Sequence, residues 1–507
     1  MNMKFESLIK LRFRMVLLLL CSALMLVVPL QAQNKKPNII FIVADDLGWQ
    51  DVGFMGSQWF ETPNLDRLAK ESLVFSDAYM YPTCSPSRTA LLTGKQSFRT
   101  GVYTVPVLER GNNQDNIFSR WTVGTEHPVY AEPLNKAGYK LIHLGKWHIV
   151  GPNPEEELEY PFEQKLKQPA NGDTSWVANH KLNYKQYYPT GRGFHENVGG
   201  SWWGDPARGY QDGYKSESGG YKAPFKNPFI EDKEDDEWLT DRLTNEAIDF
   251  IKKNKNEPFF VNLHYYAPHR PTVPRNSKWL QKFMAKAPDT VTGQGSKRLE
   301  EIAGYATMIA SIDENVQRII DFLDKEGMRE NTILIFTSDN GFNGLQSNTN
   351  ALRGAKGTVY EGGIRVPAFV NWKGRIVPGS SEIPICGMDY FPTFLELANI
   401  RDYKGILDGR SLVPIFTGHE IEERPLFWHL ASAYKNPPCS IIRKGKWKLI
   451  QFLNDEKLEL YNLENDLKES SNLVEERKQL TESLLEELIE WRKKNKAPLP
   501  SASSLKF

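Results

Sequence analysis

The stretch that decides the fold is Asn38-Ile39-Ile40-Phe41-Ile42-Val43-Ala44, followed directly by Asp45-Asp46-Leu47-Gly48. Its continuous apolar run predicts a strand buried on both faces, as in a parallel sheet covered by helices. A second buried strand is expected at Thr332–Thr337, and it is also followed by an acidic residue, in Asp339-Asn340. A helix that ends at Gly327 precedes this second strand. Strands that alternate with helices indicate a doubly wound α/β fold.

Two further strands are expected, at Tyr139–Leu144 and Phe259–Tyr265. The first is followed by Lys146 and His148, and the second by His269. In a doubly wound sheet the functional residues gather at the carboxyl ends of the strands. The four strand ends are therefore expected to supply chemistry to one rim of the sheet.

The sequence pattern changes near Arg424. From there on, short strands in which apolar and polar residues alternate replace the continuously apolar, buried strands. We expect a main domain at residues 37–420 and a C-terminal subdomain at 421–507, made of a small antiparallel sheet and a terminal helix. Residues 171–230 are rich in Gly, Tyr and Trp and lack periodicity. They are expected to form an insertion at the mouth of the active site, facing the substrate.

The N-terminal residues 1–32 have the features of a signal peptide. Basic residues precede the apolar run Met15–Val28, and Leu30-Gln31-Ala32 offers a cleavage site. The sequence thus predicts an exported protein, periplasmic or secreted, without a stable membrane span. The 507 residues carry a net charge of zero, which argues against a nucleic-acid partner.

Three cysteines remain after the signal peptide, namely Cys84, Cys386 and Cys439. An odd number flags one thiol with a separate role, and the sequence leaves open whether the other two pair. Cys84 begins Cys84-Ser85-Pro86-Ser87-Arg88, in which Pro86 suits the first position of a helix. Cys84 would then lie beside a helix N-terminus that favours anions, with Arg88 one turn away.

These motifs resemble the type I sulfatases, in particular arylsulfatase-like exported enzymes of bacteria. The resemblance runs from about Pro37 to Leu473 and includes Gly145-Lys146-Trp147-His148, Ala267-Pro268-His269 and the glycine-rich stretch from Arg353 to Gly363. It implies an alkaline-phosphatase-like fold. It also implies that a maturation enzyme oxidises Cys84 to formylglycine (3-oxoalanine).

The resemblance implies catalytic roles for seven residues: Cys84, Arg88, Lys146, His148, His269, Asp339 and Lys356. In the family, the hydrated aldehyde attacks the sulfur of a sulfate ester after Asp339 helps to deprotonate it. His269 protonates the departing alcohol while Lys356 neutralises the developing charge. His148 then drives the expulsion of sulfate, which regenerates the aldehyde.

The same resemblance implies a metal site made of Asp45, Asp46, Asp339, Asn340 and the modified Cys84. The two pairs that end the strands are hard oxygen donors without histidine. Donors of this kind favour Ca²⁺ over zinc, with Mg²⁺ as the second choice.

Export and the aromatic insertion favour a sulfated saccharide as substrate, with an aryl sulfate as the simpler alternative. Trp202 and Trp203 are expected to stack on sugar rings, and Asp205, Arg208 and His429 are candidate polar contacts. The competing interpretation is that the aromatic residues, which include Tyr221, merely pack the insertion.

Two other functions remain open from the sequence. A phosphonate or phosphate ester hydrolase of the same superfamily would share much of the site, and a vestigial glycan-binding relative would have lost part of it. His264 precedes His269 on the same strand and is either structural or directed at the substrate.

Overall fold

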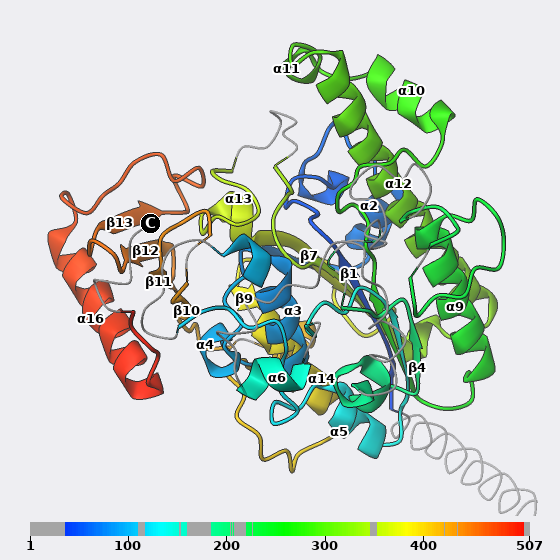
Figure 1. Cartoon of the computed structure of the whole chain (residues 1–507), viewed down its shortest axis with the longest axis horizontal. Helices are drawn as coiled ribbons and strands as arrows, with labels where there is room; N and C mark the ends of the chain where they lie inside the picture. The colour runs from blue at the N-terminus through cyan, green and yellow to red at the C-terminus, as the bar shows by residue number, and fades with distance from the viewer. Residues whose placement is uncertain are drawn as a thin grey trace, which may run out of the picture.

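The structure is a computed structural model that describes residues 36–109, 117–151, 154–159, 184–202, 204, 206, 220–225, 227–344, 352–419, 421–432 and 434–500. The signal peptide expected at residues 1–32 lies outside this range and stays a prediction. Helices and strands keep the labels of Figure 1.

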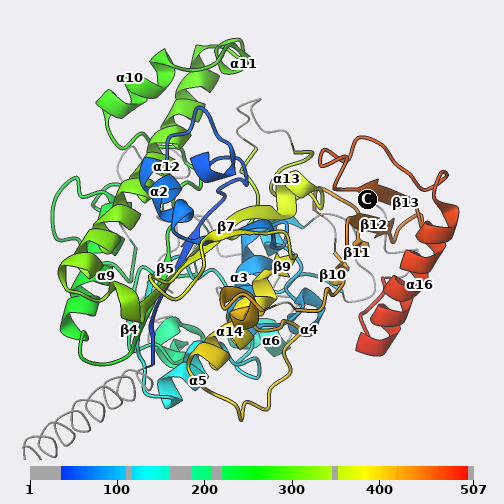
Figure 2. The same cartoon turned by 180° about the vertical axis from the view of Figure 1, so that it is seen from behind.

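A mostly parallel sheet forms the centre of the molecule (Figures 1 and 2). Among the described residues it has nine strands: β1 (Asn38–Ala44), β2 (Leu73–Tyr79), β3 (Lys140–Gly145), β4 (Glu196–Val198), β5 (Phe259–His264), β6 (Thr332–Ser338), β7 (Arg365–Asn371), β8 (Gly379–Ser381) and β9 (Ile385–Cys386). The order is β4-β3-β5-β1-β6-β7-β2-β8, with β9 paired to β2. Only β7 runs antiparallel to its neighbours among these strands.

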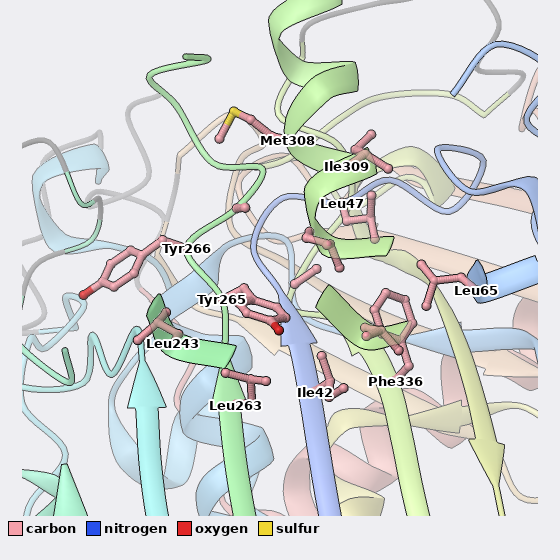
Figure 3. Close-up of a cluster of buried hydrophobic side chains, with 14 of the residues drawn as sticks. Ile42, Leu47, Leu65, Leu243, Leu263, Tyr265, Tyr266, Met308, Ile309 and Phe336 are labelled. Atoms are coloured by element: carbon pink, nitrogen blue, oxygen red, sulfur yellow. The ribbon is translucent and has the colours of Figure 1, made fainter. Parts of the chain in front are cut away.

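Strand β1 lies in the middle of the sheet, and its alternating side chains enter two different cores. Ile40 and Ile42 join the core under α2 (Pro63–Lys70), α9 (Leu239–Lys253) and α12 (Ser296–Lys325), part of which Figure 3 shows. Ile39, Phe41 and Val43 face the opposite side, under α3 (Cys84–Thr93), α5 (Ala131–Lys136) and α14 (Tyr390–Leu397). Every residue of β1 is buried, which explains why its sequence is apolar without alternation.

In the described part of the chain, six further helices complete the main domain. They are α4 (Ser97–Thr100), α6 (Pro154–Glu159), α10 (Ser277–Ala285), α11 (Asp289–Thr292), α13 (Glu361–Ile364) and α15 (Val413–Phe416). None of the described helices is both long enough and apolar enough to cross a membrane.

A second, antiparallel sheet lies at the side of the molecule opposite α9 (Figures 1 and 2). It consists of β10 (Leu426–Leu430), β11 (Cys439–Lys444), β12 (Trp447–Phe452) and β13 (Leu458–Asn462), in that order. One face packs on Leu484 and Leu488 of α16 (Lys478–Asn495). The other face shares a core with Tyr79 and Tyr81 of the main sheet region. The expected fold class is therefore confirmed.

Three expectations need correction or completion. Helix α3 begins at Cys84 rather than at Pro86, because the first turn of a helix has no intrahelical acceptor for its N–H groups and tolerates proline throughout. The segment 171–230 is not only a cover, since β4 extends the main sheet and Tyr221 belongs to the core. Cys386 and Cys439 are both buried free thiols.

Candidate active site

The carboxyl ends of β1, β3, β5 and β6 meet at one rim of the sheet, because these strands run parallel. Asp45 and Asp46 follow β1, Lys146 follows β3 and Asp339 follows β6. Helix α3 starts at the same rim with Cys84. The sheet topology thus brings together residues that are up to several hundred positions apart in the sequence.

Three ion pairs, two of them fully buried and the third with a partly buried lysine, form the centre of the site. Lys146 Nζ lies 2.6 Å from Asp45 Oδ2, and Arg88 Nη2 lies 2.8 Å from Asp339 Oδ2. Lys356 Nζ lies 2.6 Å from Asp46 Oδ1. Each of these cations is therefore matched by one carboxylate.

The acidic residues also bond to one another through their backbone and amide groups. The backbone N–H of Asp46 donates to Asp339 Oδ1 at 3.1 Å, and Asn340 Nδ2 donates to Asp46 Oδ1 at 2.8 Å. Asp46 adopts a left-handed backbone with φ of 66°. Strained residues of this kind occur at functional sites that the surrounding packing holds in place.

The acidic cluster fits a hard divalent cation. Asp45 Oδ1 and Asn340 Oδ1 are buried and accept no hydrogen bond from any described residue. Burial and the nearby Asp339 carboxylate raise the pKa of Asp45 well above its usual range. Against the effect of burial, Lys356 and His269 hold the pKa of Asp46 well below its usual range. Crowded oxygen donors with unsatisfied lone pairs are stabilised by a cation.

Arg88 is fixed on three sides at the first turns of α3. Besides Asp339, its Nη1 donates to the carbonyl of Lys146 and to His264 Nδ1, each at 3.0 Å. Because a guanidinium only donates, His264 Nδ1 is unprotonated. Burial, followed by Arg88, lowers the pKa of His264 well below its usual range. Of the two roles left open for His264, the structure favours the structural one.

Cys84 is the first residue of α3 and is buried at the bottom of the site. Burial raises the pKa of its thiol, against the nearby ammonium groups of Lys146 and Lys356. A nucleophilic cysteine needs a lowered pKa. The unmodified thiol is therefore poorly suited to act as the nucleophile itself.

His148 has the second left-handed backbone of the site, with φ of 57°. Its N–H donates to the carbonyl of Ser201 at 3.2 Å, and its Nδ1 lies 3.5 Å from Ser85 Oγ. Burial, followed by Lys146 and Arg88, lowers the pKa of His148 well below its usual range. The neutral imidazole that results can accept a proton.

His269 reaches the cluster from the loop after β5. Its Nδ1 lies 2.7 Å from the carbonyl of Arg270, which can only accept, so Nδ1 carries the proton. The other nitrogen, Nε2, lies 3.6 Å from Asp46 Oδ2. The ligand atoms of Asp45, Asp46 and His269 are close enough to hold one metal ion, so His269 is a neighbour of the metal site as well.

Two positioning residues of this region were not identified from the sequence. The hydroxyl of Tyr221 donates to the carbonyl groups of Tyr266 and His269, and its ring stacks on Trp238. Tyr221 therefore supports the His269 loop and does not stack on a substrate. Tyr305 donates to the carbonyl of Asp46. No local motif marks either residue, because both act through contacts between distant segments.

Among the residues expected to contact the substrate, the structure places those that it describes in different surroundings. Trp202 is partly buried and follows Ser201, whose carbonyl binds His148. Trp203, Asp205 and Arg208 lie outside the described residues. His429 is corrected: it is fully buried, and its ring nitrogens bond to Ser440 Oγ and to the carbonyl of Pro498. Its side chain is therefore not available to a substrate.

A small pocket lies between the segment that precedes α3, the loop that carries Lys356 and the connection from β10 to β11. Its lining comes from four segments and consists of Pro82, Thr83, Tyr103, Thr104, Gly357, Val359, Leu430, Ser432, Tyr434, Asn436 and Pro437. The C-terminal subdomain therefore reaches the chain next to Cys84.

Comparison with known proteins decides the family. The profile described as Sulfatase matches residues 37–400, and one described as N-sulphoglucosamine sulphohydrolase, C-terminal, matches residues 355–494. This chain belongs to the sulfatase family. It is a type I, formylglycine-dependent member by family, with an alkaline-phosphatase-like fold, and it is a sulfuric ester hydrolase.

Individual relatives cover most of this sulfatase. A sulfatase of Formosa agariphila is 30% identical over 92% of this chain and 90% of its own length. The N-acetylgalactosamine-6-sulfatase of Canis lupus familiaris is 32% identical over 82% of this chain and 71% of its own. The crystal structure of Ps i-CgsB has a TM-score of 0.68 and 29% identity, covering 90% of this chain and 93% of that one.

The contact between Gly204 and His148 gives a first test of the site. A Cβ at Gly204 would lie 2.7 Å from His148 Cε1 and Nε2, so Gly204→Ala should displace the imidazole. We expect turnover of a small aryl sulfate to fall on the order of 10- to 100-fold, with unchanged thermal stability. Gly379→Ala is the matched control, because no atom lies within 4 Å of its added Cβ. Full activity of Gly204→Ala would contradict the role of His148.

Proposed function

We propose that this protein is an exported sulfatase that removes sulfate from sulfated carbohydrates, with formylglycine at position 84 and one bound Ca²⁺. The observation that carries the proposal is the position of Cys84. It begins α3 at the rim where Arg88, Lys146 and Lys356 meet three carboxylates. A sulfate ester placed there would meet a nucleophile, cations and two imidazoles at once.

Modified residue 84 would supply a hydroxyl of an aldehyde hydrate as the nucleophile. The residues around it orient the ester. Arg88 offers a guanidinium locked by Asp339 and His264, and Lys146 adds an ammonium, so both suit sulfate oxygens. The neutral His148 beside Ser85 is placed to take a proton in the step that releases sulfate.

On the other side of the acidic cluster, His269 and Lys356 serve the departing alcohol. Both lie against Asp46, at 3.6 and 2.6 Å, and both come from loops that flank the opening of the site. His269 would donate from Nε2 in its doubly protonated form, because its Nδ1 proton is bonded to the carbonyl of Arg270. That proton and the charge of Lys356 would lower the cost of releasing a poor leaving group.

The cation would be held by Asp45, Asp46, Asp339 and Asn340 together with residue 84. The two buried oxygens that accept no hydrogen bond from the described residues, Asp45 Oδ1 and Asn340 Oδ1, support this set. Their hard-donor character favours Ca²⁺, with Mg²⁺ second. When bound, the cation would polarise the sulfate group.

Carbohydrate as the substrate class is supported by relatives. One relative is an N-acetylgalactosamine-6-sulfatase, and a solved complex of Ps i-CgsB, 29% identical with a TM-score of 0.67, contains k-i-k-neocarrahexaose. Export, to the periplasm or the medium, is supported by the N-terminal sequence. A formylglycine-generating enzyme would act on the chain during maturation.

Replacement of Cys84 tests the nucleophile. Cys84→Ala should fold normally and lose sulfatase activity, because a methyl group cannot be oxidised to the aldehyde. Mass spectrometry of the active protein should find the peptide around residue 84 with an aldehyde in place of the thiol. Cys386→Ala, at another buried free thiol, should keep both the modification and the activity. An active protein whose Cys84 is wholly an unmodified thiol would contradict the proposal.

Replacement of Asp339 tests the metal site. Asp339→Asn keeps the shape of the side chain but removes its charge, so elemental analysis should find the calcium content and the activity both lost. Asp324→Ala, on the surface of α12, should retain one ion per chain. Stoichiometric zinc in the active protein, with no alkaline-earth ion, would contradict the ligand assignment.

Replacement of Trp202 tests the substrate class. Trp202→Ala should reduce kcat/KM about 10-fold on a sulfated oligosaccharide, since a lost ring stack is worth about 1 kcal/mol. A small aryl sulfate should be affected little, because it needs only the sulfate pocket. Trp372→Ala, just after β7 at the opposite end of the sheet, is the control. Equal losses on both substrates would show that Trp202 is scaffold.

A further inference from the structure

Lys356 is carried by a loop whose position is set by the second sheet. The Lys356 loop, defined here as Arg353–Glu361, has no regular structure before α13 begins at Glu361. The side chain of Lys356 points at Asp46. The backbone N–H groups of Lys356 and Gly357 donate to the carbonyls of Phe342 and Pro82 in the main domain. Several other groups of the loop bond to residues of the C-terminal sheet and its connections. Nothing within the loop itself fixes the ammonium group.

A fully buried charge triad holds the C-terminal end of the Lys356 loop. Lys448 Nζ, from β12, lies 2.9 Å from Glu361 Oε1 and 2.8 Å from Glu469 Oε1. The backbone N–H of Glu361 donates to Glu469 Oε2 at 2.7 Å. Tyr79 and Arg365 bond to the other oxygen of Glu361. Against the effect of burial, Lys448 and Arg365 lower the pKa of Glu361 to about 2, so it is ionised.

The middle and the start of the loop are held from the same side. Asn436 Oδ1 accepts from the backbone N–H of Val359 at 2.9 Å. Arg353 Nη1 donates to Tyr461 OH and to the carbonyl of Glu469, each at 2.8 Å. Its guanidinium also lies 3.7 Å from the centre of the Tyr360 ring. The second sheet therefore contacts the loop along its whole length.

The loop is also held on its other side, where the backbone N–H of Lys356 donates to the carbonyl of Phe342 at 2.9 Å. The residues that directly follow the loop, Gly362 and Gly363, pack closely against Gly341. A Cβ at Gly341, just after β6, would lie 1.9 Å from the carbonyl oxygen of Gly362. The backbone N–H of Gly341 donates to the carbonyl of Gly363 at 2.9 Å. The loop is thus clamped between the end of β6, next to Asp339, and the second sheet.

We infer that the C-terminal sheet positions Lys356 for the departure of the alcohol, and that Lys448 is the positioning residue through which it does so. Buried ion groups are costly to desolvate and are a weak source of stability, but they fix geometry when every member is bonded. The inference rests on the proposed function, because it assumes that Lys356 assists the leaving group.

The test uses a series of aryl sulfates whose phenols differ in acidity, with the full-length, matured protein. Loss of Lys356 should lower kcat/KM most for the substrates with the poorest leaving groups. Lys356→Ala should therefore steepen the dependence of log kcat/KM on phenol pKa. Lys448→Met should also make this dependence steeper. Its kcat/KM should fall on the order of 10-fold for the poorest leaving group and little for the best. In the Lys356→Ala background, Lys448→Met should add no further loss.

The matched control is Lys444→Met, because Lys444 pairs with Glu487 on the surface of α16 and should leave the series unchanged. Asn436→Ala covers the case in which Lys448→Met does not fold. Asn436→Ala should steepen the dependence of log kcat/KM on phenol pKa, but less than Lys448→Met does. Asn436→Asp keeps the acceptor for the Val359 N–H and should restore the wild-type dependence.

The outcomes separate the two proposals. If Lys356→Ala leaves the leaving-group dependence unchanged, the role of Lys356 in the proposed function is wrong, and the positioning role is overturned with it. If Lys356→Ala steepens the dependence but Lys448→Met or Asn436→Ala lowers every member of the series equally, only the positioning role is overturned. Additive losses in the double variant would also overturn it.

Discussion

The pairing of two buried cations and one partly buried cation with three buried carboxylates is the interaction on which the site depends. Arg88 with Asp339, Lys146 with Asp45 and Lys356 with Asp46 join α3, β1, β3, β6 and the Lys356 loop at one rim. Each ion would cost several kcal/mol to bury alone, and only a close partner offsets this. The parallel sheet meets this requirement because its strand ends deliver both signs of charge to the same place. A bound dication would then give the rim a net positive charge, which suits a sulfate ester.

Two residues of the site have strained backbones, and the structure shows what holds them. Asp46 and His148 both have positive φ. The carbonyl of Asp46 accepts from Tyr305 on α12, and the N–H of His148 donates to the carbonyl of Ser201. Conformations of this kind cost of order 1–3 kcal/mol and persist only where the surroundings impose them. The helix layer and the insertion therefore do more than cover the sheet, since they hold a carboxylate and an imidazole of the site in place.

Sequence reasoning predicted the parts of the molecule that have a local signature. The strand Asn38–Ala44 was predictable because burial on both faces requires a continuous apolar run, and the ligand and cation motifs directly follow such strands. The features that sequence reasoning predicted wrongly or missed depend on contacts between distant segments. His429 looks available in the sequence, but the chain near Pro498 returns to cover it. Strand β7 runs antiparallel to its neighbours, and Lys448 of β12 pairs with Glu361 at the start of α13. No sequence periodicity predicts either arrangement.

The central claim is that the charge-balanced rim acts on sulfate monoesters. The most direct measurement compares kcat/KM of the purified, matured protein on para-nitrophenyl sulfate and para-nitrophenyl phosphate under the same conditions. Because the chain belongs to the sulfatase family, the site should prefer the sulfate ester to the phosphate ester. A clear preference for sulfate is the predicted result. Equal or faster turnover of the phosphate would contradict the account.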